Sequence, residues 1–353
     1  MTEEELALQQ VQQILEEMTL EQKLYQMFIV TPEQLTGVDT VIAAGDTTKN
    51  SLSEYPVGGL IYFAHNLKSE QQTRQMLENT QTFAKESMGL PLFLCVDEEG
   101  GSVARIADNP SFHVPKVEAM QTIKSETAAY EAGETIGSYL ERIGFNVDFA
   151  PDADVLTAEG NTVIGDRSFG SDPDAVTHLA CAYSDGLHAH QILSTFKHFP
   201  GHGAVKEDTH EGFAYTDKTY EELAACELKP FMEAQKRQVD MVMVAHISVP
   251  VIVGDGTPCT LSYEMTTEVL REKCGYEGLI VTDALNMGAI TGFCTPGEAA
   301  VGVVKAGADL ILMPKDFAAA FGALQKAVEQ GEIESARIDD SVRRIIAAKL
   351  RLE

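Results

Sequence analysis

A segment near the middle of the chain contains residues suited to proton transfer. Residues 197–212 read KHFPGHGAVKEDTHEG, and within them Asp208 and His210 lie two positions apart. A carboxylate beside an imidazole fixes its tautomer and favours its protonated form, which makes a proton donor that works near neutral pH. The D-x-H motif is short and common, so taken alone it also fits two solvated loop residues.

The same segment is predicted to be a long, structured loop. From Phe199 onward it has no apolar periodicity, and its glycines permit tight turns. Long loops in compact domains are usually functional or disordered, and the Phe199-Pro200 anchor disfavours disorder. His198 also fits a buried histidine with satisfied hydrogen bonds, and His202 also fits a turn residue. Because no HExxH or comparable ligand spacing is present, we expect no metal and no cofactor.

Polar residues also end several apolar runs elsewhere in the chain. Eight such runs are near-continuous rather than alternating, which is typical of parallel strands buried on both faces. They span residues 27–30, 59–63, 91–96, 145–150, 192–196, 241–245, 279–281 and 310–313. The polar residues at their ends are Asp97, Lys197-His198, His246 and Asp283. In a barrel, the carboxyl ends of the strands share one mouth, where polar residues serve chemistry.

Amphipathic segments separate the runs and predict helices. Thr2 and Glu5 could form a capping box for a first helix. Its inward stripe is predicted to hold Leu8, Val11, Leu15 and Met18. Further helices are predicted over residues 69–87, 125–142, 173–188, 220–237, 263–274, 296–306, 317–330 and 335–350. In the last of these, the inward positions are Ile338, Val342, Ile345 and Ile346.

This alternation predicts an α/β fold, a (β/α)₈ TIM barrel, with a doubly wound sheet as the alternative. No low-complexity linker divides the chain. We therefore expect one catalytic barrel domain over residues 1–353, without a C-terminal sandwich domain.

Composition restricts the partners. The formal net charge is −28, from 26 basic and 54 acidic residues, so nucleic acid and anionic membranes are repelled on average. The six cysteines are scattered, and Cys95 fits a core position. The N-terminus MTEEELALQQ lacks the features of a signal peptide, and no run reaches about 18 apolar residues. We expect a cytoplasmic monomer without a membrane span; a removed leader would instead indicate a secreted or lipid-anchored form.

Four motifs in order carry a family resemblance. KHFPGHG with the following D-x-H resembles glycoside hydrolase family 3, in particular its bacterial β-N-acetylglucosaminidase branch. VDEEGGSVARI (96–106), NTVIGDRSFGSDP (161–173) and GLIVTDALNMGAI (278–290) are similar to further family motifs, and the likeness begins at MTLEQKLYQMF near residue 18. The resemblance implies a barrel enzyme that cleaves glycosidic bonds.

The resemblance also implies roles for individual residues. Asp283 matches the family's nucleophile, His210 the acid/base of this branch, and Asp208 the residue that orients His210. The positions that match sugar-holding residues are Asp97, Arg105, Arg167, Lys197 and His198. One departure is Ala284, where many relatives carry a second acid.

The implied activity is removal of terminal β-linked N-acetylglucosamine (GlcNAc) with retention, through a glycosyl-aspartate, from muropeptides of peptidoglycan turnover or similar oligosaccharides. A β-glucosidase or β-xylosidase of the same family is an alternative, although without the sandwich domain it has no evident proton donor. A GlcNAc phosphorylase is another, because a neutral imidazole does not repel phosphate. A silent sugar-binding barrel should have lost Asp283 or His210, and a metal-dependent hydrolase should be sensitive to chelators.

Overall fold

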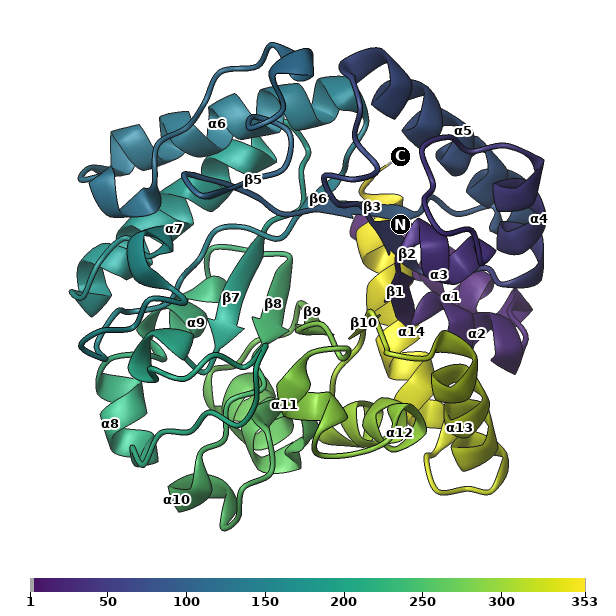
Figure 1. Cartoon of the computed structure of the whole chain (residues 1–353). Coiled ribbons are helices and arrows are strands. Elements are labelled where there is room, and N and C mark those ends of the chain that lie inside the picture. Colours follow the sequence, from purple (N-terminus) through teal and green to yellow (C-terminus); the bar gives the residue numbers. More distant parts are fainter. Residues whose placement is uncertain (1–2, 353) are drawn as a thin grey trace.

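Short parallel strands near the centre of the molecule alternate with surrounding helices (Figure 1). The computed structural model describes residues 3–352. One sheet has the order β10-β1-β2-β3-β6 and a second has the order β7-β8-β9. The strands are β1 Phe28–Val30, β2 Gly59–Ile61, β3 Phe93–Val96, β6 Val147–Asp148, β7 Thr195–Phe199, β8 Met241–Val244, β9 Leu279–Thr282 and β10 Ile311–Leu312.

Both sheets are parallel, and further parallel bridges lie at their edges. Val147 of β6 pairs with Leu193 just before β7, and Val281 of β9 pairs with Leu310 just before β10. Asp148 donates its backbone N–H to Leu193 at 3.0 Å, and Thr282 donates to Leu310 at 3.1 Å. The α/β class and the parallel strands predicted from the sequence are thereby confirmed.

Each of the eight predicted apolar runs overlaps a strand. The strand residues are buried throughout, as their continuous apolar character predicts. A small antiparallel hairpin of β4 (Glu98–Gly100) and β5 (Val103–Ala104) follows β3 and was not predicted.

Long amphipathic helices cover the outside of the strands (Figure 1). They are α1 Glu3–Glu17, α5 Glu70–Met88, α6 Glu126–Ile143, α7 Pro173–His188, α12 Pro296–Ala306, α13 Phe317–Glu329 and α14 Ser335–Leu350. The shorter helices are α2 Leu20–Gln26, α3 Pro32–Thr36, α4 Asp46–Glu54, α8 Tyr220–Ala225, α9 Lys229–Ala234, α10 Pro250–Val253 and α11 Gly288–Thr291. The 3₁₀ turns are η1 Pro110–Phe112, η2 Met120–Thr122, η3 Gly165–Arg167, η4 His202–Ala204 and η5 Cys259–Leu261.

The structure corrects several helix predictions. Residues 220–237 form two helices, because Pro230 fits only the first turn of a helix and a new one therefore begins at Lys229. Residues 264–273 (η6) form a π-helix. Leu8 is exposed, whereas the other three positions of the predicted α1 stripe are buried. Thr2, part of the expected capping box, lies outside the described residues. The helices α2, α3 and α4 were not predicted.

The two ends of the described chain pack together. Helix α1 contacts α14, whose inward positions Ile338, Val342, Ile345 and Ile346 are fully buried as predicted. All six cysteines are unpaired, and Cys95 is buried in β3. Within residues 3–352, every helix is too short or too polar to cross a lipid bilayer.

Candidate active site

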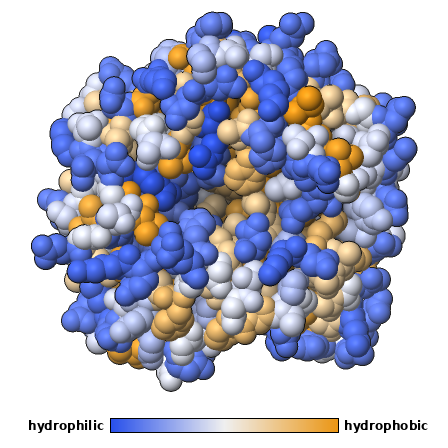
Figure 2. All heavy atoms as spheres, viewed as in Figure 1, coloured by the Kyte–Doolittle hydropathy of each residue, from blue (hydrophilic) through white to orange (hydrophobic). Residues whose placement is uncertain are grey.

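The carboxyl ends of the strands bring charged side chains together. Asp97 directly follows β3, and Lys197 and His198 lie within β7. Lys197 Nζ lies 3.0 Å from Asp97 Oδ1, so residues one hundred positions apart form an ion pair. This part of the predicted strand-end cluster is therefore assembled. Figure 2, which views the molecule from the same side as Figure 1, shows a hollow near the middle of the visible face, with hydrophilic residues along its left side.

Glu99, in β4, joins this ion pair to a second buried cation. Lys197 Nζ lies 2.5 Å from Glu99 Oε1, and Arg167 donates two parallel hydrogen bonds to Glu99 at 2.8 and 2.9 Å. Burial alone would raise the pKa of Glu99, but Arg167 and Lys197 hold it well below its ordinary value. Arg167 and Lys197 are thus both present at the site and both held by one carboxylate that the sequence analysis did not select.

His198 is held between Arg167 and a buried aspartate. Its Nδ1 lies 2.7 Å from Asp154 Oδ2, and its Nε2 lies 3.5 Å from Arg167 Nη2. Burial lowers the pKa of His198 to about 4, so the ring is neutral near pH 7. Because a guanidinium can only donate, Nε2 accepts and Nδ1 carries the proton given to Asp154.

This tautomer bears on metal binding. Asp152, Asp154 and His198 offer ligand atoms within 4.8 Å of one another, a spacing that can hold a cation. Metal coordination at Nδ1 requires a free lone pair there, and it would leave Nε2–H facing the donors of Arg167. The contacts therefore favour a hydrogen-bonded group, in which Asp154 orients His198, rather than a metal centre.

Asp283 follows β9 and is tied to its neighbours through the backbone. Its N–H donates to Val244 of β8 at 2.9 Å, and its Oδ1 accepts the N–H of Ala284 at 2.7 Å. Burial would raise the pKa of Asp283, but His246, His198, the Ala284 N–H and His210 together lower it below its ordinary value. An ionised, partly exposed carboxylate at a strand end is suited to act as a nucleophile.

His246 supports the peptide next to Asp283. It lies two residues after β8, is fully buried, and its Nε2 lies 2.9 Å from the Ala284 carbonyl oxygen. Its Nδ1 lies 2.7 Å from Thr260 Oγ1. His246 was predicted as a strand-end residue but not as a residue of the site.

The loop after β7 presents His210 to solvent. His210 Nδ1 lies 2.8 Å from Asp208 Oδ1, and the side chain of His210 is 67% exposed. The predicted Asp208–His210 pair is thus formed through Nδ1, and Nε2 makes no hydrogen bond within residues 3–352. Burial would raise the pKa of Asp208, but hydrogen bonds from the backbone and ring of His210 lower it.

Backbone contacts hold this loop beside the segment that follows Asp283. Gly288 donates its N–H to the His210 carbonyl, and Ala289 donates to the Thr209 carbonyl, both at 3.1 Å. A β-carbon at Gly288 would lie only 2.6 Å from the His210 oxygen, so glycine permits the close approach. The loop of His210 is therefore fixed to residues 288–289, five and six positions after Asp283.

His202 connects the same loop to Asp154. Its N–H donates to Asp154 Oδ1 at 2.6 Å, and its Nε2 lies 3.1 Å from Thr209 Oγ1. Asp154 thus binds both His198 and the loop that carries His210. The sequence predicted His202 as a turn residue and Asp154 was missed, although the D-x-D at residues 152–154, shortly after the predicted strand, was the available signal.

Arg105 is placed differently from the other predicted site residues. It directly follows the β4–β5 hairpin, and its Nε is buried without a hydrogen-bond partner in residues 3–352. Within residues 3–352, its side chain makes no hydrogen bond or ion pair with Asp97, Lys197 or Arg167.

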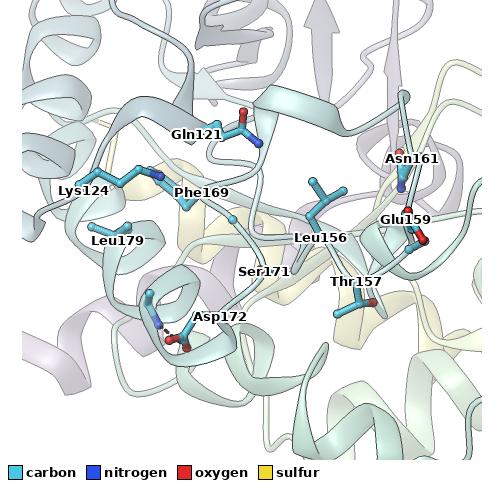
Figure 3. Close-up of a pocket in the computed structure, with 14 residues that line it drawn as sticks. Gln121, Lys124, Leu156, Thr157, Glu159, Asn161, Phe169, Ser171, Asp172 and Leu179 are labelled. Atoms are coloured by element: carbon cyan, nitrogen blue, oxygen red, sulfur yellow. Dashed lines mark hydrogen bonds between the residues drawn. The ribbon is translucent and has the colours of Figure 1, made fainter.

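A wide cavity lies beside these residues rather than among them. It has a volume of about 720 Å³ and lies between the loops that flank η3, with Lys124 and Asp172 on one side and Thr157 and Asn161 on the other (Figure 3). None of the predicted site residues lines it. Asn161 connects it to the His210 loop, because its Nδ2 donates to the carbonyls at 202 and 205.

Comparison with known proteins adds a family to this geometry. The family model for the glycosyl hydrolase family 3 N terminal domain matches residues 19–348. A β-hexosaminidase A of Pseudoalteromonas piscicida is 34% identical and the match covers 85% of this chain, but the chain spans only 54% of that relative. A β-hexosaminidase of Idiomarina loihiensis is 33% identical, with 82% of this chain and 86% of the relative covered.

A solved structure agrees with this assignment. A glycoside hydrolase family 3 β-N-acetylglucosaminidase from Paenibacillus sp. has a TM-score of 0.88 and 38% identity, covering 95% of this chain and 62% of its own. The region that the family model matches includes every strand and the loop of His210. This chain belongs to glycosyl hydrolase family 3.

Proposed function

We propose that the chain is a retaining exo-β-N-acetylglucosaminidase that removes terminal GlcNAc. The observation that carries the proposal is the Asp208–His210 pair at 2.8 Å, with an exposed imidazole on a loop bonded to residues 288–289. The names of the β-hexosaminidase and β-N-acetylglucosaminidase relatives support the sugar.

Asp283 acts as the nucleophile and His210 as the acid/base. In the first step an Asp283 oxygen bonds to the anomeric carbon while the glycosidic bond breaks and His210 Nε2 gives its proton to the departing oxygen. In the second step neutral His210 takes a proton from water, whose oxygen bonds to the anomeric carbon and releases Asp283. The lowered pKa of Asp283 supports an ionised nucleophile.

The sugar ring and its hydroxyl groups are held by four side chains, those of Asp97, Lys197, Arg167 and His198. Their shared contacts with Glu99 and Asp154 fix their directions before substrate arrives, which reduces the entropic cost of orienting it. The family resemblance assigns Arg105 to the same role, and its buried Nε makes no hydrogen bond within residues 3–352.

We also infer that the eight parallel strands form one closed (β/α)₈ barrel. The bridges Val147–Leu193 and Val281–Leu310 support this, because they link the two sheets at both edges. A closed barrel gives all the strand-end residues a common mouth. The family resemblance supports muropeptide or other cell-wall fragments as the source of the terminal GlcNAc.

Turnover of nitrophenyl β-glycosides tests the proposal. We expect the GlcNAc compound to be cleaved faster than the glucose and xylose compounds, and NMR to show the β-anomer as first product. Faster glucoside cleavage or an α-product would contradict it. Formation of GlcNAc 1-phosphate in phosphate buffer would assign the acceptor to phosphate instead of water, and mass spectrometry of muropeptide and chitobiose digests identifies the fragment class.

A further inference from the structure

Two exposed aromatic side chains follow His210 on the same loop. Phe213 is 55% exposed and Tyr215 is 46% exposed, and their rings stack with centroids 5.7 Å apart at 24°. Burial of a large aromatic side chain is strongly stabilising, so an exposed stacked pair indicates a surface that binds a ligand or partner.

The backbone holds this pair as a rigid platform. Ala214 and Thr216, the residues that alternate with the aromatic ones, are buried. Ser248 donates its N–H to the Ala214 carbonyl at 2.8 Å, and Thr216 donates to the Ser248 carbonyl at 3.0 Å. The segment therefore adopts a strand-like arrangement that directs both aromatic rings to the same outer face.

The ring of Phe213 lies beside the turn that contains Gly256. A β-carbon built at Gly256 would lie 3.5 Å from two atoms of the Phe213 ring, which is an ordinary van der Waals distance. Ser248 Oγ also donates to the Gly256 carbonyl at 2.8 Å. Phe213 is thus bordered by this turn and remains 55% exposed.

The platform lies on the same rim as the proposed chemistry. His210 is three residues before Phe213, and its carbonyl is bound by Gly288. Ser248, the partner of Tyr215, is two residues after His246, whose ring contacts the carbonyl of Ala284. Both ends of the aromatic segment are therefore fixed to elements that adjoin Asp283.

The position of His210 indicates what binds there. Under the proposed function, the oxygen that His210 protonates belongs to the leaving group, so the leaving group departs on the side of the loop. An aromatic face suits the C–H face of a pyranose ring, while nearby carboxylates can accept hydrogen bonds from its hydroxyls.

We propose that Phe213 and Tyr215 form a leaving-group subsite, on which the sugar ring next to the terminal residue stacks during cleavage. This inference rests on the proposed function, because it takes His210 as the proton donor. It names a substrate class: oligosaccharides with a second pyranose ring beyond the bond that is cut.

Substrates with and without that ring test the subsite. Chitobiose carries a sugar leaving group, whereas β-N-acetylglucosaminyl fluoride releases an ion that cannot stack. We expect Phe213→Ala and Tyr215→Ala each to lower kcat/KM for chitobiose about fivefold to tenfold, which is of the order of one aromatic contact. The value for the fluoride should change less than twofold.

Conservative and control variants separate binding from loop support. Phe213→Tyr and Tyr215→Phe keep the rings and should retain most of the chitobiose activity. Tyr130→Ala removes an aromatic side chain of similar exposure (41%) on α6 and should affect neither substrate.

The outcomes are distinct. A selective loss on chitobiose supports the subsite. An equal loss on both substrates overturns it, because the rings would then only support the His210 loop, and no loss on either substrate also overturns it. If the wild-type protein cleaves neither substrate, the proposed function itself fails, which differs from a wild-type enzyme whose variants keep the same substrate ratio.

Discussion

Gly288 provides a sharp test of how the His210 loop is positioned. A β-carbon added by Gly288→Ala would lie 2.6 Å from the His210 carbonyl oxygen and 2.9 Å from the Glu211 carbonyl carbon. An ordinary contact begins near 3.4 Å, so the loop must move by about 0.8 Å or lose its two backbone hydrogen bonds to residues 288–289.

The size of this shift sets the expected loss. A misplacement of about 1 Å can reduce catalysis about 100-fold, so we expect kcat/KM for chitobiose to fall about 30-fold to 100-fold. The fluoride substrate should lose much less, since fluoride departs with little help from an acid. The free energy of unfolding should fall by only about 1–3 kcal/mol, as for other overpacked sites.

Steady-state kinetics with both substrates, together with thermal unfolding, make the assay. Gly322→Ala is the matched control, because Gly322 lies in α13 and a β-carbon there meets nothing within 4 Å. A folded Gly288→Ala protein with unchanged chitobiose turnover would refute the reasoning. So would an equal loss on the fluoride, which would indicate damage to the nucleophile side.

Three further predictions concern buried charge. Glu99→Gln removes the carboxylate that two buried cations share and should lower the free energy of unfolding by about 3–5 kcal/mol at pH 7 in urea titrations. Glu86→Gln, which breaks an exposed ion pair, should lower it by less than about 1 kcal/mol. Burial lowers the pKa of Lys349 to about 7 from 10.5, so its contribution to stability is present above pH 10.5 and is lost as the pH falls through 7. Lys349→Met should therefore raise Tm most at pH 6. A Tm difference between variant and wild type that stays constant from pH 6 to 10 would contradict this. Burial and the charge of Asp154 raise the pKa of Asp152 to about 8 from 3.8, so its contribution to stability is present below pH 3.8 and is lost as the pH rises through 8. Asp152→Asn should therefore raise Tm relative to wild type at pH 9, with a smaller gain at pH 5.

The strands were predictable because their signal is local. Continuous apolar runs such as residues 93–96 need burial on both faces, and the same local pattern located Asp97 and Asp283 at strand ends. The break between α8 and α9 was missed because apolar periodicity continues through it, although Pro230 limited where a helix could begin.

Glu99 and His202 show where local reasoning stops. Glu99 sits in an acidic pair that fits a solvated surface, and its partner Arg167 is 68 positions away. His202 resembled a turn residue until Asp154 and Thr209 were brought to it by folding. The sequence identifies which groups carry charge, but the pairing of buried charges depends on tertiary contacts between distant segments.

The most direct test of the central claim is the leaving-group dependence of His210→Ala. If His210 is the acid/base, kcat/KM for chitobiose should fall at least about 100-fold, and that for β-N-acetylglucosaminyl fluoride should change only a few-fold. Added azide should then restore breakdown of the covalent intermediate and yield the β-glycosyl azide. Equal losses on both substrates, or unchanged chitobiose cleavage, would contradict the account.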